Sequence, residues 1–118
     1  MSTPRDNILT EVKQDLTALG VMNEDNEPKA EVYFKYALNF ILDECNQDFT
    51  SEDGEELDEF PDVLKGVIAQ MIIQRLNKEG SEGIEKEKLG DYSVSYSKKE
   101  LPKNLLTQIY NHKVVRVT

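Results

Sequence analysis

Apolar residues recur at helical spacing in four stretches of the chain. The third stretch is the strongest, because its apolar side chains are one to four residues apart from Leu64 to Leu76. Pro61 stands where a helix can begin, so a long central helix is predicted from there to about Lys78. The other predicted helices run from Pro4 to about Gly20, from Pro28 to about Cys45, and from Pro102 through Tyr110.

The predicted second helix has a wider apolar face than contact with one other helix requires. Its main stripe consists of Ala30, Phe34, Ala37, Ile41 and Cys45. Three further residues widen this stripe: Tyr33, Leu38 and Leu42. We therefore expect these three side chains to be candidates for contact with a partner subunit.

Two short runs with strand-like alternation, 84–89 and 92–97, follow the long helix. Gly90 and Asp91 lie between them and suit a two-residue turn, so a two-stranded β-hairpin is predicted at 84–97. Tyr92, Val94 and Tyr96 fall on one face of the second run and serines on the other. Because an isolated hairpin is marginally stable in water, this aromatic face must pack against something else, and its residues are further partner-interface candidates.

These elements predict a mainly α fold: a small bundle of about four helices, with one two-stranded β-hairpin between the long third helix and the short last helix. Residues 1–112 are expected to form a single helical domain, and residues 113–118 a C-terminal tail. The tail residues with strand propensity or positive charge are Lys113, Val114, Val115, Arg116 and Val117. The tail either adds an edge to the hairpin, pairs with a partner, or is a frayed terminus; its basic residues favour a partner, since they could steer it to an acidic surface.

Charge is unevenly distributed along the 118 residues, whose net charge is −9. Residues 1–62 carry 17 acidic and 4 basic side chains, a net of −13, whereas residues 63–118 carry 6 and 10, a net of +4. An acidic half of this size argues against general binding of nucleic acid, which needs a concentrated basic surface. No apolar run approaches the ~18 residues of a membrane span, and the N-terminus lacks the apolar region of a signal peptide. We expect synthesis in the cytoplasm and no contact with a membrane.

The residues needed for catalysis or for cofactor binding are sparse. Cys45 and His112 are the only cysteine and histidine, too few for a zinc site, and Cys45 is expected to be a buried, inert thiol. None of the glycines falls in a phosphate-binding pattern. A calcium loop centred on Gly54 fails, because its first and twelfth positions would be Phe49 and Phe60, which cannot bind a cation. The sequence therefore predicts no catalytic residue, no cofactor and no metal site.

Two segments combine with the order of elements to suggest a family. Residues 74–80 read Gln-Arg-Leu-Asn-Lys-Glu-Gly, and residues 89–96 read Leu-Gly-Asp-Tyr-Ser-Val-Ser-Tyr, between a long helix and a short one. A chain of this size with this arrangement resembles the head–tail connector proteins of long-tailed bacteriophages, also called adaptor or head-completion proteins.

The resemblance implies a structural virion protein and no enzyme. Such proteins form a ring, usually of twelve subunits, beneath the portal protein, and join it to the next neck or head-closure protein. DNA passes through the centre of the ring without specific binding, and the C-terminal tail is expected to extend towards the portal. Two other classes stay open: an acidic helical binding module that regulates another protein, and a small enzyme.

The excess of acidic residues in the first 62 positions predicts that the purified protein does not bind duplex DNA. Phosphate contacts by basic side chains are strongest at low salt, so a gel-shift assay in low-salt buffer is the most demanding test. We expect no shift of the duplex at any protein concentration. A tight, salt-sensitive shift would contradict this prediction and favour the acidic regulator.

Overall fold

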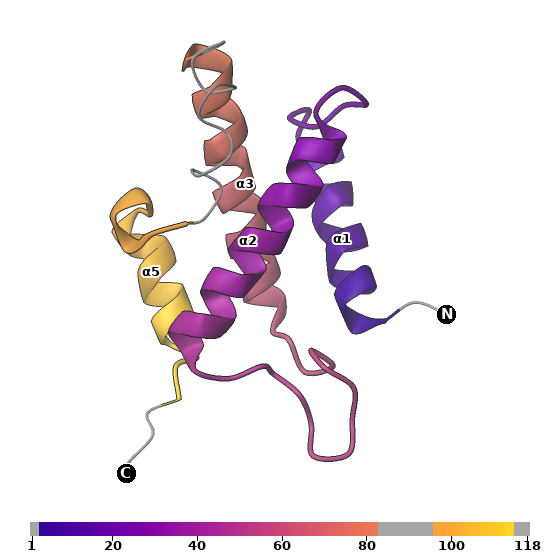
Figure 1. The fold of residues 1–118 in the computed structure, drawn as a ribbon, viewed down its shortest axis with the longest axis vertical. Helices are drawn as coiled ribbons and strands as arrows, with labels where there is room; N and C mark the ends of the chain where they lie inside the picture. Colours follow the sequence, from indigo (N-terminus) through magenta and orange to yellow (C-terminus); the bar gives the residue numbers. More distant parts are fainter. Residues whose placement is uncertain (1–2, 83–95, 115–118) are drawn as a thin grey trace.

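The chain folds as α-helices packed around one long central helix (Figure 1). The computed structural model describes residues 3–82 and 96–114, with side chains described in the third helix as far as Asn77. In chain order the helices are α1 (Pro4–Ala18), α2 (Glu27–Cys45), α3 (Asp62–Glu82), the short 3-10 helix η1 (Lys98–Glu100) and α5 (Lys103–Tyr110). The mainly α fold predicted from the sequence is confirmed.

Local capping sets both ends of α1. The Thr3 hydroxyl accepts a hydrogen bond from the backbone N–H of Asp6 at 3.1 Å, and the Asp6 carboxylate accepts one from the backbone N–H of Thr3 at 3.2 Å. Gly20, at φ +76°, provides the left-handed turn that follows the helix. Because α1 ends at Ala18, Leu19 leaves its apolar stripe and is 61 % exposed.

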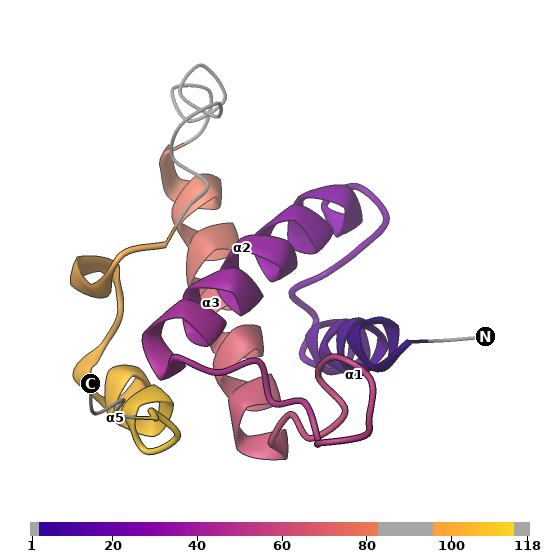
Figure 2. The ribbon, with the colours of Figure 1, turned by 60° about the horizontal axis from the view of Figure 1, so that its bottom comes forward.

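α3 is the central element, because it contacts α1, α2 and α5. α2 crosses it, and α1 and α5 lie on opposite sides of it (Figures 1 and 2). Five of the six apolar residues that the sequence pattern places on one stripe of α3 are buried almost completely: Leu64, Val67, Ile68, Met71 and Ile72. The sixth, Leu76, is half-buried. Each buried aliphatic side chain of this size contributes about 1.5–3 kcal/mol through removal from water. The core therefore forms around the helix with the densest apolar pattern.

The acidic segment between α2 and α3 closes one end of this core. Leu57 and Phe60 are buried, and Phe49 is buried with them. The rings of Phe49 and Phe60 meet edge to face at 5.2 Å, and the Phe49 carbonyl accepts a hydrogen bond from Glu59 at 2.8 Å. The segment is thus anchored by apolar contacts while its carboxylates stay in solvent.

The predicted β-hairpin at 84–97 is wrong. The described residues contain no strand, and the last two hairpin positions, Tyr96 and Ser97, lead into η1 instead. The Ser97 backbone N–H donates to the Glu100 carboxylate at 3.1 Å, which caps η1. The other hairpin residues, 84–95 with the turn at Gly90 and Asp91, lie outside the described residues. α3 itself continues past Gly80 to Glu82.

A cluster around Arg75 attaches η1 to α3. The Arg75 guanidinium lies 4.1 Å from the centre of the Tyr96 ring and donates to the Glu100 carboxylate at 2.8 Å. The Tyr96 hydroxyl donates to the backbone carbonyl of Met71 at 3.2 Å. Arg75 also lies 5.6 Å from the Tyr33 ring of α2, so it joins three elements of the fold.

Replacing Arg75 by alanine is expected to lower the free energy of unfolding by about 1–3 kcal/mol, because it removes a largely desolvated charge that two aromatic rings and Glu100 contact. Urea unfolding followed by circular dichroism measures this change. The matched control is Arg5→Ala, which removes the ion pair with Glu56. The Arg5 side chain is 40 % exposed against 11 % for Arg75, so the control should cost about 0.5 kcal/mol or less. Equal costs for the two variants would contradict this account.

Candidate assembly interface

The broad apolar face of α2 is used mainly inside the subunit. Of its three partner-interface candidates, Leu38 is fully buried, Tyr33 is 7 % exposed and Leu42 is half-buried. α2 contacts α1, α3 and α5, so neighbours cover more of its circumference than a two-helix contact would. Of these three side chains, Leu42 has the most surface left for a partner.

A different line of apolar side chains runs along the outer face of α2. Val32 is exposed, and Tyr36 and Phe40, each four residues further on, are half-buried. Residues four apart share one face of a helix, so this line was visible in the sequence. Its three residues were not among the predicted interface candidates, because the neighbouring stripe with five members is the stronger pattern.

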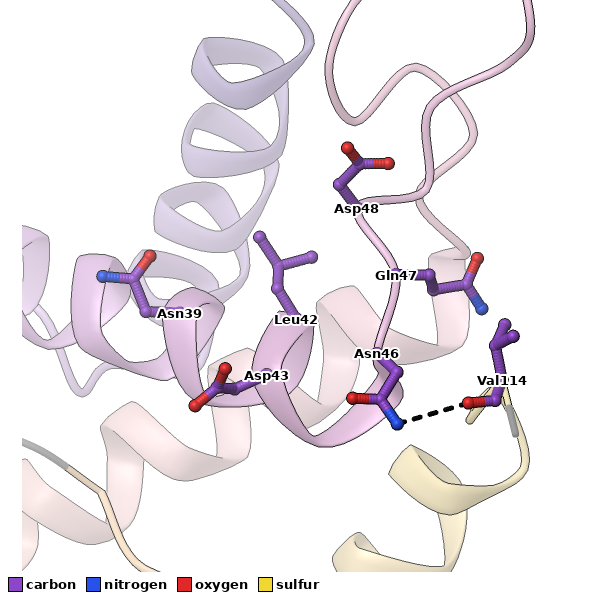
Figure 3. Close-up of a pocket in the computed structure, with 7 residues that line it drawn as sticks. All are labelled: Asn39, Leu42, Asp43, Asn46, Gln47, Asp48 and Val114. Atoms are coloured by element: carbon purple, nitrogen blue, oxygen red, sulfur yellow. Dashed lines mark hydrogen bonds between the residues drawn. The ribbon is translucent and has the colours of Figure 1, made fainter. Parts of the chain in front are cut away.

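A groove lies at the C-terminal end of α2, with a volume of about 740 Å³ (Figure 3). We call it the terminal groove, and the residues that line it are Asn39, Leu42, Asp43, Asn46, Gln47, Asp48 and Val114. Asn46 adopts a left-handed conformation, φ 56°, that ends α2 and turns the chain towards Asp48. The groove thus brings together a helix end, the start of the acidic segment and the start of the tail.

Hydrogen bonds to the end of α2 hold the start of the tail. The backbone N–H of Val114 donates to the carbonyl of Cys45 at 2.8 Å, and the Asn46 side-chain amide donates to the carbonyl of Val114 at 3.3 Å (Figure 3). The Gln47 side-chain amide donates to the carbonyl of His112. Val114 is therefore fixed against the end of α2, with both its backbone N–H and its carbonyl in use, and Lys113 is fixed by its hydrogen bond to Tyr110 of α5.

The terminal groove is electrically negative. The carboxylates of Asp43 and Asp48 are on its rim, and the last carbonyls of α2 add the negative end of the helix dipole. Leu42 and Val114 contribute apolar surface. A ligand for this groove would combine positive charge with small apolar groups.

Charged surfaces of opposite sign lie on opposite sides of α3. One is the acidic loop, residues 48–59, whose carboxylates are all exposed. The other, the basic edge, consists of the exposed Lys98, Lys99 and Lys103 on η1 and α5. Figures 1 and 2 both place the loop and the η1–α5 segment on either side of the α3 N-terminus. The subunit can therefore present an acidic surface to one neighbour and a basic surface to another.

Of the interface candidates in the predicted hairpin, the structure describes Tyr96. This side chain is buried on α3 beside Arg75. Five other interface candidates lie outside the described residues: Tyr92, Val94, Val115, Arg116 and Val117. The start of the tail is close to Leu42 in the terminal groove, while Tyr33 and Tyr96 meet at Arg75. The structure thus brings the described candidates together in two places.

The single thiol, Cys45, is buried and has a raised pKa, so it is expected to react slowly. Cys45 is fully buried and donates a weak hydrogen bond to the carbonyl of Ile109 at 3.3 Å. Burial, with a smaller effect of the neighbouring Glu44 charge, raises the pKa of Cys45 to about 11. The His112 ring packs against Phe49 at 6.2 Å between ring centres. In the part of the chain that the structure describes, no three potential metal ligands gather, and no helix has the length and apolarity to cross a membrane.

Comparison with known proteins gives one match. The family model described as phage gp6-like head-tail connector protein matches residues 7–113. This range contains most of α1 and the whole of α2, α3, η1 and α5. No curated protein and no solved structure matches the chain.

The raised pKa of Cys45 predicts that the native protein reacts slowly with a thiol reagent such as Ellman's reagent at about pH 8, and rapidly in urea. Burial of the neutral thiol stabilises the fold fully below the ordinary pKa of 9.0, and this contribution is lost as the pH rises towards 11. The urea midpoint should therefore fall more between about pH 8 and pH 10 in the native sequence than in Cys45→Ala. Rapid labelling of the folded protein would contradict the burial.

Proposed function

This chain belongs to the family of phage gp6-like head-tail connector proteins, and we propose that it acts as one subunit of a ring that joins the portal to the next neck protein. Membership makes it a structural protein of the head–tail junction that contacts other head and tail proteins. The family match over residues 7–113 is the observation that carries the proposal, because it includes nearly every described helix.

The opposite charges of the acidic loop and the basic edge support a head-to-tail contact between subunits. Such a contact uses two different surfaces of each copy, and it closes into a ring when the rotation between copies divides a full turn. The basic edge, Lys98, Lys99 and Lys103, would face residues 48–59 of the next copy. Ion pairs between these two surfaces would be weak individually, but they would fix the orientation of neighbouring subunits. A closed ring repeats the contact between every two neighbours, so the whole ring would be stable.

We propose that the two ends of the ring contact different partners, the portal at one end and the next neck protein at the other. The terminal groove, with Leu42 and Val114, offers surface for a neck protein, and the tail, residues 113–118, is the segment proposed to reach the portal. Tyr33 and Leu38 are buried, so their part in assembly would be to hold α2 in place.

Passage of DNA through the ring agrees with the charge of the chain. Residues 1–62 have a net charge of −13, and carboxylates that face a channel repel the phosphate backbone. Repulsion would keep the DNA from adhering while it moves. We propose a ring of twelve subunits, the number usual in this family.

We expect the protein to be a monomer or small oligomer when dilute and to form rings when concentrated or when given its portal. Raising the salt from about 0.05 M to about 0.5 M should weaken this self-association, because exposed charges are screened. Sedimentation velocity and light scattering measure the oligomeric state, and negative-stain imaging identifies rings.

Charge reversal provides the sharper test. The double variant Lys99→Glu with Lys103→Glu should weaken self-association by about tenfold or more, since it places like charges against the acidic loop. Lys29→Glu with Lys35→Glu on α2 changes the net charge equally and should leave association within about twofold. Equal effects of both pairs would eliminate the proposed contact. A strictly monomeric protein at high concentration that also fails to bind a portal ring would refute the function.

A further inference from the structure

The central helix α3 has one side that no described element covers. Figures 1 and 2 show α2 across α3, with α1 and α5 to either side of it. On the remaining side, residues three and four positions apart form a line that we call the open face. Its members are exposed or half-buried: Val63, Gly66, Gln70, Ile73 and Asn77. Val63 is 48 % exposed, so the open face includes apolar surface.

Nothing in the described part of the subunit requires a glycine at position 66. A glycine inside a helix is less stable than alanine, because it loses more backbone freedom on folding. Gly66 has no positive φ, and a Cβ atom added to it would meet no described atom within 4 Å. A bare helix backbone also lets another molecule approach closely. At Gly66 this approach is open from outside the subunit.

α5 presents an aromatic ring to solvent beside the basic edge. Tyr110 is 37 % exposed and lies two helical turns after Lys103, on the same face of α5. The ammonium groups of Lys98 and Lys113 lie 6.0 and 5.7 Å from the centre of its ring. The Tyr110 hydroxyl donates to the Glu44 carboxylate at 3.2 Å, so the ring is held in place before any partner binds. A fixed tyrosine among lysines suits an acidic surface.

The open face is complementary to this tyrosine in charge and in shape. The Asp62 side chain, next to Val63, is 95 % exposed although it pairs with Lys65 at 3.0 Å, and it continues the row of carboxylates of the acidic loop. Negative charge at this end of α3 thus matches the positive charge around Tyr110. The absence of a side chain at Gly66 leaves space for a bulky ring, with the apolar surface of Val63 beside it.

The spacing along the two helices agrees with this match. Lys103 and Tyr110 are about 10 Å apart along α5. Gly66 is about 6 Å along α3 from Asp62, and the acidic loop ends three residues before Asp62. A Tyr110 ring above Gly66 therefore leaves Lys103 of the same copy within reach of Asp62 or the loop.

We propose that the outer face of α5 in one copy docks on the open face of α3 in a second copy, with the Tyr110 ring over Gly66. The proposal rests on the proposed head-to-tail contact, to which it adds an apolar anchor. Because the two surfaces are different, each copy can bind one neighbour on each side. The ring at the centre of the contact supplies most of the affinity, whereas the surrounding ion pairs mainly fix the orientation.

Cross-linking between cysteine variants locates the contact. A mixture of Gly66→Cys protein and Tyr110→Cys protein, treated with a short bis-maleimide, should form linked dimers about tenfold faster than either variant alone, because the contact joins two different surfaces. A protein with both substitutions should give a ladder of linked oligomers. The native Cys45 does not interfere, since it is buried. The control mixture pairs Gly66→Cys with Leu19→Cys, a 61 % exposed position outside both surfaces, and should link about as slowly as single variants.

Substitutions at Gly66 separate the fold from the contact. Gly66→Ala should raise the melting temperature by about 2–6 °C, because alanine favours the helix and its Cβ atom has free space. The same substitution should weaken self-association, measured by sedimentation velocity, by about threefold, and Gly66→Leu by about tenfold or more, because the new side chain takes the place of the ring. The matched control, Ala18→Leu at an exposed position of α1, should leave association within about twofold.

Tyr110→Ala should weaken self-association by about tenfold or more, as loss of a central aromatic anchor does. Leu19→Ala removes an exposed apolar side chain elsewhere and should leave association within about twofold. Circular dichroism of each variant verifies that the helices are intact. Cross-linking does not depend on these variants, so it decides the contact even where one of them unfolds.

The outcomes distinguish this contact from the proposed function. Unchanged association in Gly66→Leu and Tyr110→Ala, or equal cross-linking in the control mixture, would overturn the contact and leave a ring held by other surfaces. Rapid cross-linking of Gly66→Cys protein alone would indicate a two-fold symmetric contact and would also overturn it. Linked ladders from a protein that fails to co-sediment with a portal ring would refute the proposed function and leave the contact standing. A native protein that stays monomeric at high concentration would refute the contact.

Discussion

Burial of α3 by three other helices is the constraint on which the rest of this structure depends. Ile68, Met71 and Ile72 lose nearly all contact with water, and this is possible only because α1, α2 and α5 each cover part of the helix. No single neighbour covers its apolar circumference. The packing of α3 therefore decides on which side of the helix α1, and η1 with α5, lie.

That packing also decides where charge is placed. The described residues bury no polar or charged side chain completely, so the many acids and bases of the chain are on or near the surface. The segment from α2 to α3 has only Phe49, Leu57 and Phe60 as anchors and leaves its carboxylates outside. η1 and α5 return on the other side of α3 with their lysines exposed. Separation of charge between two surfaces is thus a consequence of the helix order, and it suits a protein that has a neighbour on each side.

The failure of the hairpin prediction has a specific physical cause. Alternation of Tyr92, Val94 and Tyr96 with serines satisfies the local pattern of a strand, but that pattern does not include contacts with residues distant in sequence. At the described end of this segment, Ser97 uses its backbone N–H to cap η1, and the side chain of Tyr96 is bound to α3 through Met71 and Arg75. The contact of Tyr96 with Met71 joins residues 25 positions apart, so no local pattern could reveal it, whereas the cap between Ser97 and Glu100 is local.

The sequence alone determined what depends on neighbouring residues. The cap formed by Thr3 and Asp6, the proline at the start of α2 and the dense apolar spacing of α3 act within one or two helical turns, so the helices and their order could be predicted. The resemblance to the family rested on this order together with the residues at 74–80 and 89–96, and the family match over residues 7–113 confirms it. The tertiary structure decided which surfaces remain: it buried Leu38, left Val32 exposed, and joined Val114 to Cys45, which α3, η1 and α5 separate in the sequence. Burial depends on what lies opposite a side chain in space, and only the packed helices supply that.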